Sequence, residues 1–438
     1  MRNLIGRLRR PISRSQLTKA LTLISDGDGS TLSLDFTAMS ALDPRFTFTR
    51  NSLATFINSQ GLIQEVTAAA TNDPTKARFD YDPTTFAPRG LLIEGSTTNL
   101  LPWSESFATS GATTNWNWSA LGVTRGTSTQ TDPKGVSSTV IKIEETSATG
   151  VHAPLIVPSA SSSTTYTASV FAKAAERSYV QLFDNGGSSA SAMVNLSNGA
   201  VVSESTPGIT TVTAFGTTGW YRISMRLTTG AAQTSINFQL RLSTNGTTTS
   251  YAGTTGSGIY IWGAQLEQSA GATSYIPTGA GTVQRAADDL QLTGADFSSI
   301  WPSGLSEWSV YWSGDITRSP ATTQFVWLAR AGGSSRTRGF VTTGSGIRSS
   351  NNIADLTPGL SATVNTVFKM ATGFKNADCF MWAHNGTTTA SAAETSSGLQ
   401  TDSDRLLFNV NADNFMHIRQ FKFWQSRLSN GTLQGLVS

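Results

Sequence analysis

The sequence predicts a mostly β protein, with two antiparallel β-sandwich domains following a short N-terminal helical segment. Two observations predict this class. Charged residues make up only 13% of the 438 residues, about half of the roughly 25% that is usual, and Ser, Thr, Gly and Asn runs such as 159–165 and 247–258 take their place. Strand-like segments with alternating apolar and polar residues lie between these Gly-rich turns, and the length exceeds one ordinary core.

Residues 1–31 are expected to form a basic arm with a short helix. Pro11 interrupts the arm, and apolar residues recur at helical spacing after it. So short a helix is not stable alone. It either lies on its own domain, docks on a larger assembly or a symmetry mate, or binds a membrane surface. The residues expected to anchor the arm are Arg7, Arg9, Arg10, Leu17, Leu21 and Ile24.

Residues 32–101 predict an irregular leader, because their apolar stretches are short and interrupted by Pro and Arg. Residues 102–288 then show the period-two alternation of a sandwich with one wet face. In 220–227, for example, Ile223 and Met225 point one way, while Arg222, Ser224 and Arg226 point the other.

Residues 289–438 predict a second β-sandwich. Trp308, Val310 and Trp312 alternate with polar neighbours, and a last strand is expected over about 416–424. Ser429 is a plausible cap for a short terminal helix.

Charge and composition exclude several functions. The net charge is only +3 and no basic stripe runs through the body, so no nucleic-acid partner is expected. No apolar run approaches the ~20 residues that cross a bilayer. The single cysteine, Cys379, lies in an apolar run and is interpreted as a small buried hydrophobe.

Several separated blocks, in order, resemble phage head-spike and tail-fibre proteins. They comprise 46–56, Arg78-Phe-Asp-Tyr-Asp-Pro83, Pro88-Arg-Gly-Leu-Leu-Ile-Glu94, 99–101, 166–173, 219–223, 259–267, 273–277 and Arg285-Ala-Ala-Asp288. In that family the leader precedes a jelly roll similar to carbohydrate-binding modules. The C-terminal third, through Trp308-Ser-Val-Tyr-Trp312 and 427–434, resembles a concanavalin-A-like (laminin-G-like) domain. Folds host many functions, so the resemblance names no ligand.

This resemblance implies a virion surface protein that mediates adsorption by binding host polysaccharide. Its partners would be other virion proteins, through the N-terminal arm, and the host glycan. A homo-oligomer is expected, with a trimer favoured and a pentamer as the alternative. A structural decoration or collar adaptor and a glycan depolymerase are the rival interpretations.

Catalytic and metal motifs are missing from the sequence. None of His152, His384 and His417 has zinc-ligand spacing, and there is no nucleophile elbow or phosphate-binding loop. No cofactor is expected, and calcium is possible but unsupported. Asp288 and Asp289 are interpreted as linker residues. The carboxylates that could serve a depolymerase are not distinguishable: Glu144, Glu145, Asp184, Asp402 and Asp404.

A sugar site instead needs aromatic faces and polar side chains. Trp116 and Trp118 lie in a polar stretch and form the first candidate for an exposed stacking platform, with core filling as the alternative. Trp382, near an Asn-Gly turn, and Arg330, beside a Gly-Gly loop, are candidates in the second sandwich.

Overall fold

The computed structural model describes residues 27–109, 115–137, 140–330, 336–351, 353–395, 399, 403–409 and 414–438. The six proposed anchoring residues, Arg7, Arg9, Arg10, Leu17, Leu21 and Ile24, lie outside these ranges. None of the described helices is long and apolar enough to span a membrane.

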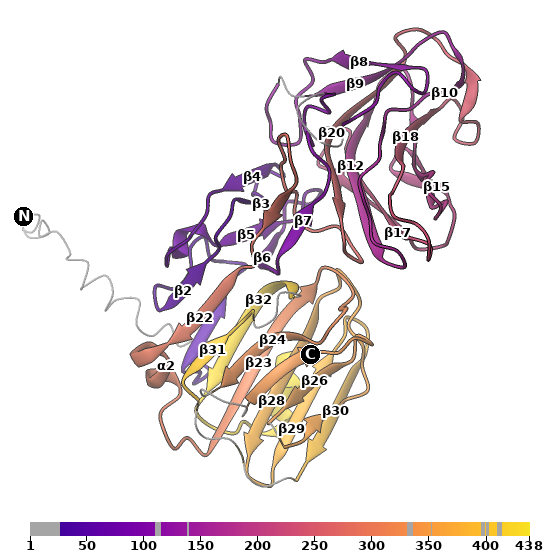
Figure 1. Cartoon of the computed structure of the whole chain (residues 1–438). Coiled ribbons are helices and arrows are strands. Elements are labelled where there is room, and N and C mark those ends of the chain that lie inside the picture. The colour runs from indigo at the N-terminus through magenta and orange to yellow at the C-terminus, as the bar shows by residue number, and fades with distance from the viewer. Residues whose placement is uncertain are drawn as a thin grey trace, which may run out of the picture.

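The mostly β prediction is confirmed, since the described chain forms two antiparallel β-sandwiches and only short helices. Figure 1 shows one lobe, made from the middle of the sequence, above a second lobe that holds the C-terminus. The helices are η1 (Pro74–Lys76), α2 (Gly294–Ile300) and α3 (Asn430–Val437). Helix α3 begins as predicted after Ser429, whose Oγ accepts a hydrogen bond from the Thr432 backbone N–H at 3.1 Å.

The upper lobe, called here the inserted sandwich, packs a six-stranded sheet against a five-stranded sheet. The six-stranded sheet has the order β16 (Thr210–Phe215), β17 (Trp220–Thr228), β12 (Thr165–Ala174), β20 (Gly258–Glu267), β9 (Ile141–Glu145) and β8 (Val123–Thr127). The five-stranded sheet has the order β11 (Leu155–Ile156), β18 (Phe238–Ser243), β13 (Tyr179–Asp184), β14 (Ser191–Asn195) and β15 (Ala200–Glu204). The pair β10 (Thr149–Val151) and β19 (Ser250–Ala252) completes this lobe.

The lower lobe, called here the enclosing sandwich, has an eight-stranded and a seven-stranded sheet. The first has the order β30 (Thr389–Glu394), β29 (Cys379–His384), β28 (Phe368–Lys375), β23 (Glu307–Ile316), β32 (Phe415–Trp424), β6 (Pro88–Glu94) and β5 (Arg78–Tyr81), and β1 (Leu32–Asp35) also pairs with β32. The second has the order β2 (Phe46–Thr49), β22 (Asp289–Thr293), β31 (Arg405–Leu407), β24 (Gln324–Arg330), β25 (Arg336–Val341), β26 (Ile347–Ser350) and β27 (Asp355–Leu356).

The prediction of an irregular leader over 32–101 is wrong. Its strands β1, β5 and β6 extend the eight-stranded sheet, and β2 forms the edge of the seven-stranded sheet. Their inward side chains, such as Leu34, Phe48 and Ile93, are at most 1% exposed in the core of the enclosing sandwich. These strands are too short for a clear period-two pattern, because most have only four residues. The C-terminal sandwich is therefore not made from residues 289–438 alone.

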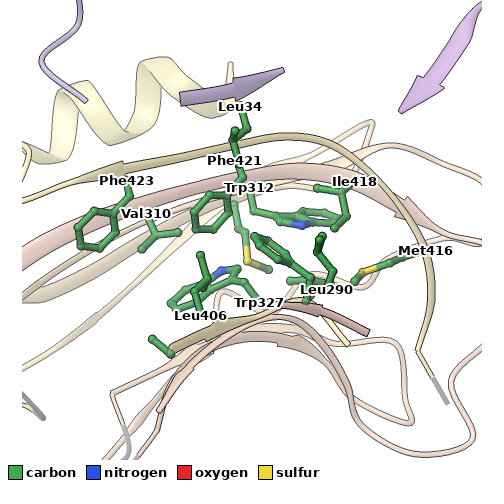
Figure 2. Packing of buried hydrophobic residues seen from close by; sticks show 14 of the residues in the cluster. Leu34, Leu290, Val310, Trp312, Trp327, Leu406, Met416, Ile418, Phe421 and Phe423 are labelled. Atoms are coloured by element: carbon green, nitrogen blue, oxygen red, sulfur yellow. The ribbon is translucent and has the colours of Figure 1, made fainter. Parts of the chain in front are cut away.

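The core of the enclosing sandwich interleaves side chains from both sheets (Figure 2). Trp312 and Phe421 come from the eight-stranded sheet, and Trp327 and Leu406 from the other. Leu34 of the leader packs on the same cluster. Burial of such large side chains is worth about 1.5–3 kcal/mol each, so the leader is an integral part of this core.

The inserted sandwich leaves and rejoins the enclosing sandwich at one place. Strand β7 (Thr97–Asn99) pairs with β21 (Val283–Arg285), and Thr97 lies opposite Arg285. The hairpin β3 (Ala54–Ile57) and β4 (Ile63–Val66) lies beside this junction (Figure 1). The jelly-roll-like middle of the chain is thus an insertion between strands β6 and β22 of the other sandwich.

Candidate functional site

The exposed stacking platform expected at Trp116 and Trp118 is not present. The two residues are only 1% and 7% exposed and lie in the core of the inserted sandwich. The Nε1 of Trp116 donates to the carbonyl oxygen of Pro102 at 3.2 Å, and that of Trp118 to Phe107 at 3.0 Å. The core alternative is therefore right, because each indole buries its apolar area and still finds a backbone acceptor.

The structure does not bring the other two candidates together either. Trp382 of β29 is partly buried against a small cluster that includes Leu433 and Val437 of α3, and its Nε1 donates to the Asn430 carbonyl at 3.1 Å. Arg330 lies at the end of β24, in the other sheet of the enclosing sandwich.

A cleft of about 410 Å³ instead opens between the two sandwiches. One wall is the outer face of the six-stranded sheet of the inserted sandwich. The other wall comes from the leader strands β3, β5 and β6 together with β32 and the segments at 317–319 and 364–365 of the enclosing sandwich. Neither Trp116, Trp118, Arg330 nor Trp382 lines it. This volume and a position between domains are typical of ligand sites.

The first wall is mostly polar, with Phe171 and Phe215 as its apolar part. Strand β17 presents Arg222, Ser224 and Arg226 to the cleft, and β16 adds Thr211 and Thr213, which pair with Ser224 and Arg222 in the sheet. The intervening residues of β17 point into the core and are fully buried. The period-two prediction for this strand is thus confirmed, and its wet face is the wall of the cleft.

Arg222 is held in place on this wall by neutral acceptors. Its Nη1 donates to the Thr273 carbonyl at 2.7 Å and its Nη2 to Ser169 Oγ at 3.2 Å. Burial lowers the pKa of Arg222, although the more distant carboxylates of Glu267 and Glu94 act in the opposite direction. An arginine nevertheless stays protonated at neutral pH. The wall therefore carries a fixed positive charge.

The opposite wall carries two partly exposed aromatic rings, Phe56 of β3 and Tyr81 of β5. Arg89 of β6 also faces the cleft, with its side chain 22% exposed and its Nη2 at 3.5 Å from Asp315 Oδ2. Aromatic faces opposite hydroxyl and guanidinium groups form the combination that binds sugars through C–H faces and hydroxyls.

His417 joins two parts of the enclosing sandwich at the edge of the cleft. Its Nδ1 lies 3.0 Å from Asp315 Oδ2 of β23, and its Nε2 lies 2.9 Å from Asp80 Oδ2 of the leader strand β5. Burial alone would lower the pKa of His417, but the charge of Asp315 and both hydrogen bonds outweigh it and raise the pKa. Both ring nitrogens are occupied, so His417 acts as a clamp and offers no free nitrogen to a ligand.

A network of buried charged side chains lies at the junction of the two sandwiches. Arg78 Nη1 lies 2.6 Å from Glu94 Oε2, and Arg285 Nη1 lies 3.0 Å from the same oxygen. The Glu94 carboxylate also accepts hydrogen bonds from the Ser274 backbone N–H at 2.8 Å and hydroxyl at 2.6 Å. Although burial works against it, these partners lower the pKa of Glu94 to about 2.

Asp288 completes the network, and its interpretation as a linker residue is wrong. Its Oδ1 lies 2.9 Å from Arg50 Nη1 and its Oδ2 lies 2.5 Å from Arg78 Nη2, with all three side chains fully buried. The adjacent Asp289 lies in β22, where its carboxylate accepts hydrogen bonds from Gln291. Sequence reasoning singled out these blocks but missed that their charged residues meet each other.

The carboxylates in the cleft are engaged with protein groups. Glu94 is ionised at neutral pH and cannot act there as a general acid. Asp80 accepts hydrogen bonds from His417 and from the Ile57 backbone N–H. Of the depolymerase candidates, Glu144, Glu145, Asp184 and Asp404 do not line the cleft, and Asp402 lies outside the described residues. No group of three potential metal-ligating side chains occurs in the described part of the chain.

Comparisons with known proteins give little further information. No protein-family model matches the chain, and no curated protein matches it. Among solved structures, a CBM40 domain of the Ruminococcus gnavus IT-sialidase bound to α2,6 sialyllactose is similar to 30% of this chain over 84% of its own length, with 14% identity and a TM-score of 0.25.

Two further structures are similar to a larger share of the chain. A putative carbohydrate binding protein from Bacteroides ovatus is similar to 66% of this chain over 80% of its own length, with 10% identity and a TM-score of 0.24. The LG1-3 region of the laminin α2 chain is similar to 65% of this chain over 67% of its own length, with 10% identity and a TM-score of 0.23. Similarities this low carry no argument about this chain, whose fold class rests on its own sheets.

Proposed function

We propose that this chain is a non-enzymatic surface protein of a tailed phage or phage-like particle, and that it binds host surface polysaccharide in the cleft between its two sandwiches. The cleft itself is the observation that supports the proposal most directly. It combines the rings of Phe56 and Tyr81 with the hydroxyls of Thr211, Thr213 and Ser224 on the facing wall. Sugars bind where an aromatic face and several hydroxyl partners converge.

The particle role is supported by the resemblance of the leader and the jelly-roll blocks to head-spike and tail-fibre proteins. Arg78, Glu94, Arg285 and Asp288 belong to those blocks and hold the two walls of the cleft together. Residues 1–31 would attach the chain to other virion proteins. A homotrimer, or a pentamer at a capsid vertex, would raise weak binding per site by avidity.

Glycan binding by the purified full-length protein tests the function. The protein is applied to an array of neutral and acidic bacterial polysaccharides, and the affinity for the best ligand is then measured for Phe56→Ala and Tyr81→Ala. Each variant is expected to bind about tenfold or more weakly, which corresponds to roughly 1.4 kcal/mol. Phe380→Ala is the matched control, because Phe380 is also partly buried but lies outside the cleft.

Two rivals give different results in the same preparation. A purely structural decoration or collar adaptor would bind no polysaccharide on the array. A depolymerase would release new reducing ends from the polysaccharide that it binds. Imaging of particles whose chain lacks residues 1–26 tests the anchor, and loss of the spikes from otherwise intact particles is the expected result.

A further inference from the structure

More arginines than carboxylates line the cleft. Four arginines line it, against the two carboxylates of Asp80 and Glu94. Both carboxylates already have cationic or hydrogen-bonding partners inside the protein, since Glu94 contacts Arg78 and Arg285 and Asp80 contacts His417. The four arginines are Arg89, Arg222, Arg226 and Arg318. Arg89 is itself paired with the buried carboxylate of Asp315, so the excess of positive charge in the cleft rests on Arg222 and Arg226.

Two of these arginines, Arg222 and Arg226, form no ion pair with any described residue. Arg222 is held rigidly by the Thr273 carbonyl and Ser169 Oγ, neither of which neutralises its charge. Arg226 is exposed at the same face of β17. A partly buried cation whose only counter-charges are the more distant carboxylates of Glu267 and Glu94 is incompletely neutralised, so an anion that enters the cleft would gain from it.

The positions of Arg222 and Arg226 along one strand suit an extended anion. Arg222 and Arg226 are four residues apart on one strand, so their Cα atoms are separated by about 13 Å at ~3.3 Å per residue. Ser224 lies between them on the same face, with Thr211 and Thr213 beside it on β16. A chain with a charge on successive sugars can contact both arginines along this face.

We infer that the cleft binds an acidic polysaccharide and that Arg222 and Arg226 receive carboxylate groups on separate sugar residues of one chain. This inference rests on the proposed function and names its substrate class. The rings of Phe56 and Tyr81 contact C–H faces of the sugars, while the hydroxyls of β16 and β17 bind their hydroxyl groups. A nucleic acid would need a wider basic surface than a chain of net charge +3 provides.

The test uses the full-length protein and matched pairs of polysaccharides. Acidic bacterial polysaccharides that carry uronic acids, nonulosonic acids or pyruvate ketals are each compared with their carboxyl-reduced, neutral form and with unrelated neutral polysaccharides. Binding to at least one acidic polysaccharide, with a loss of about tenfold or more after reduction and further weakening by salt, is the expected result.

Arginine variants test whether the carboxylates of the polysaccharide bind in the cleft. Arg222→Gln and Arg226→Gln are each expected to weaken binding of the acidic form about tenfold and binding of the reduced form by a clearly smaller factor, so that the preference for the acidic form falls. Arg226 is exposed, so its variant should fold even if Arg222→Gln does not. Arg125→Gln is the matched control, because Arg125 is exposed on β8 at the far edge of the same sheet and outside the cleft.

The possible failures are distinguishable. Equal binding of an acidic polysaccharide and its reduced form, or binding of neutral polysaccharides alone, would overturn the inference and leave the proposed function standing. Unchanged binding of Arg226→Gln would also overturn it. Tighter binding of single-stranded DNA than of any polysaccharide would assign the cleft to another class of ligand. Binding of no polysaccharide at all would remove the proposed function together with the inference.

Discussion

Asp288 Oδ2 lies 2.5 Å from Arg78 Nη2, and both side chains are fully buried. The pair joins residues 210 positions apart in the sequence. Arg78 lies in the leader strand β5, and Asp288 directly precedes β22, where the chain returns to the enclosing sandwich. The other oxygen of Asp288 contacts Arg50, and the Glu94 backbone N–H donates to Asp288 Oδ2 at 2.9 Å. One carboxylate therefore neutralises two buried arginines at the junction of the two sandwiches.

Asp288→Asn is expected to destabilise the protein by about 3–5 kcal/mol, because removing one partner of a buried ion pair leaves uncompensated charge. Urea unfolding followed by tryptophan fluorescence measures the change. Asp289→Asn is the control, since Asp289 is only partly buried and bonds to Gln291 on its own strand, and it should cost less than about 1 kcal/mol. Equal stability of the two variants would contradict the role given to Asp288.

The enclosing sandwich also predicts which fragments fold. Residues 290–438 lack β1 and β6, which pair with β32, and β2, which pairs with β22; they also lack β5, which pairs with β6. Without them the buried faces of β22 and β32 are exposed, so this fragment is expected to aggregate or remain unfolded.

A second chain serves as the comparison. Residues 27–98 joined to 284–438 by an Asn-Gly turn omit the inserted sandwich, and the turn would close a hairpin because Thr98 lies opposite Gln284. This chain is expected to give a cooperative thermal transition by circular dichroism. Folding of the isolated 290–438 fragment would show that the leader strands are dispensable.

Trp116 gives a separate test, because the sequence leaves both an exposed stacking role and a core role open for it. Its ring centroid lies 4.8 Å from that of Phe107 in the core of the inserted sandwich. Trp116→Ala is expected to cost about 3–5 kcal/mol of stability. At a temperature where the variant stays folded, its affinity for polysaccharide should equal that of the parent protein. Weaker binding of polysaccharide by a fully folded variant would instead support a role of Trp116 in stacking on the sugar.

The fold class could be predicted from the sequence because alternation is a local signal. Residues 220–227 show it without interruption, and the face assigned to solvent there is the wall of the cleft. The strands of the leader could not be predicted from alternation. Strands such as Leu32–Asp35 and Phe46–Thr49 are too short for a period to appear, and they become strands only by pairing with segments near the other end of the chain.

The cleft is harder to predict, since its walls come from distant segments. Tyr81, Arg222 and His417 line the same space although each lies in a different block of the sequence. Trp116 and Trp118 were misleading because their polar neighbours suggested exposure, whereas a large apolar ring gains most by entering a core. The alternation in β17 did show that its arginines point away from the core, but the neighbouring sequence could not show which surface they face.

His417 makes the stability of the enclosing sandwich depend on pH. Asp80 of β5 and Asp315 of β23 accept its two N–H groups, and Arg89 of β6 and Arg419 of β32 also lie within 4.0 Å of the Asp315 carboxylate. Because folding raises the pKa of His417, the protonated ring stabilises the folded state. That contribution is complete below the unfolded pKa of about 6.5 and is lost as pH rises through the higher folded pKa.

His417→Gln is expected to remove this dependence. The melting temperatures of the parent protein and the variant are compared between about pH 5 and pH 9, above the range in which the lowered pKa values of Glu94 and Asp315 affect stability. The difference in melting temperature between parent and variant should be largest near pH 5. It should shrink as pH rises, because only the parent protein loses the proton bound to His417. His384→Gln is the control, since His384 is partly exposed and bonds to Thr389 on the neighbouring strand. A difference that grows with pH would mean that His417 is neutral in the folded protein and that the clamp holds without its charge.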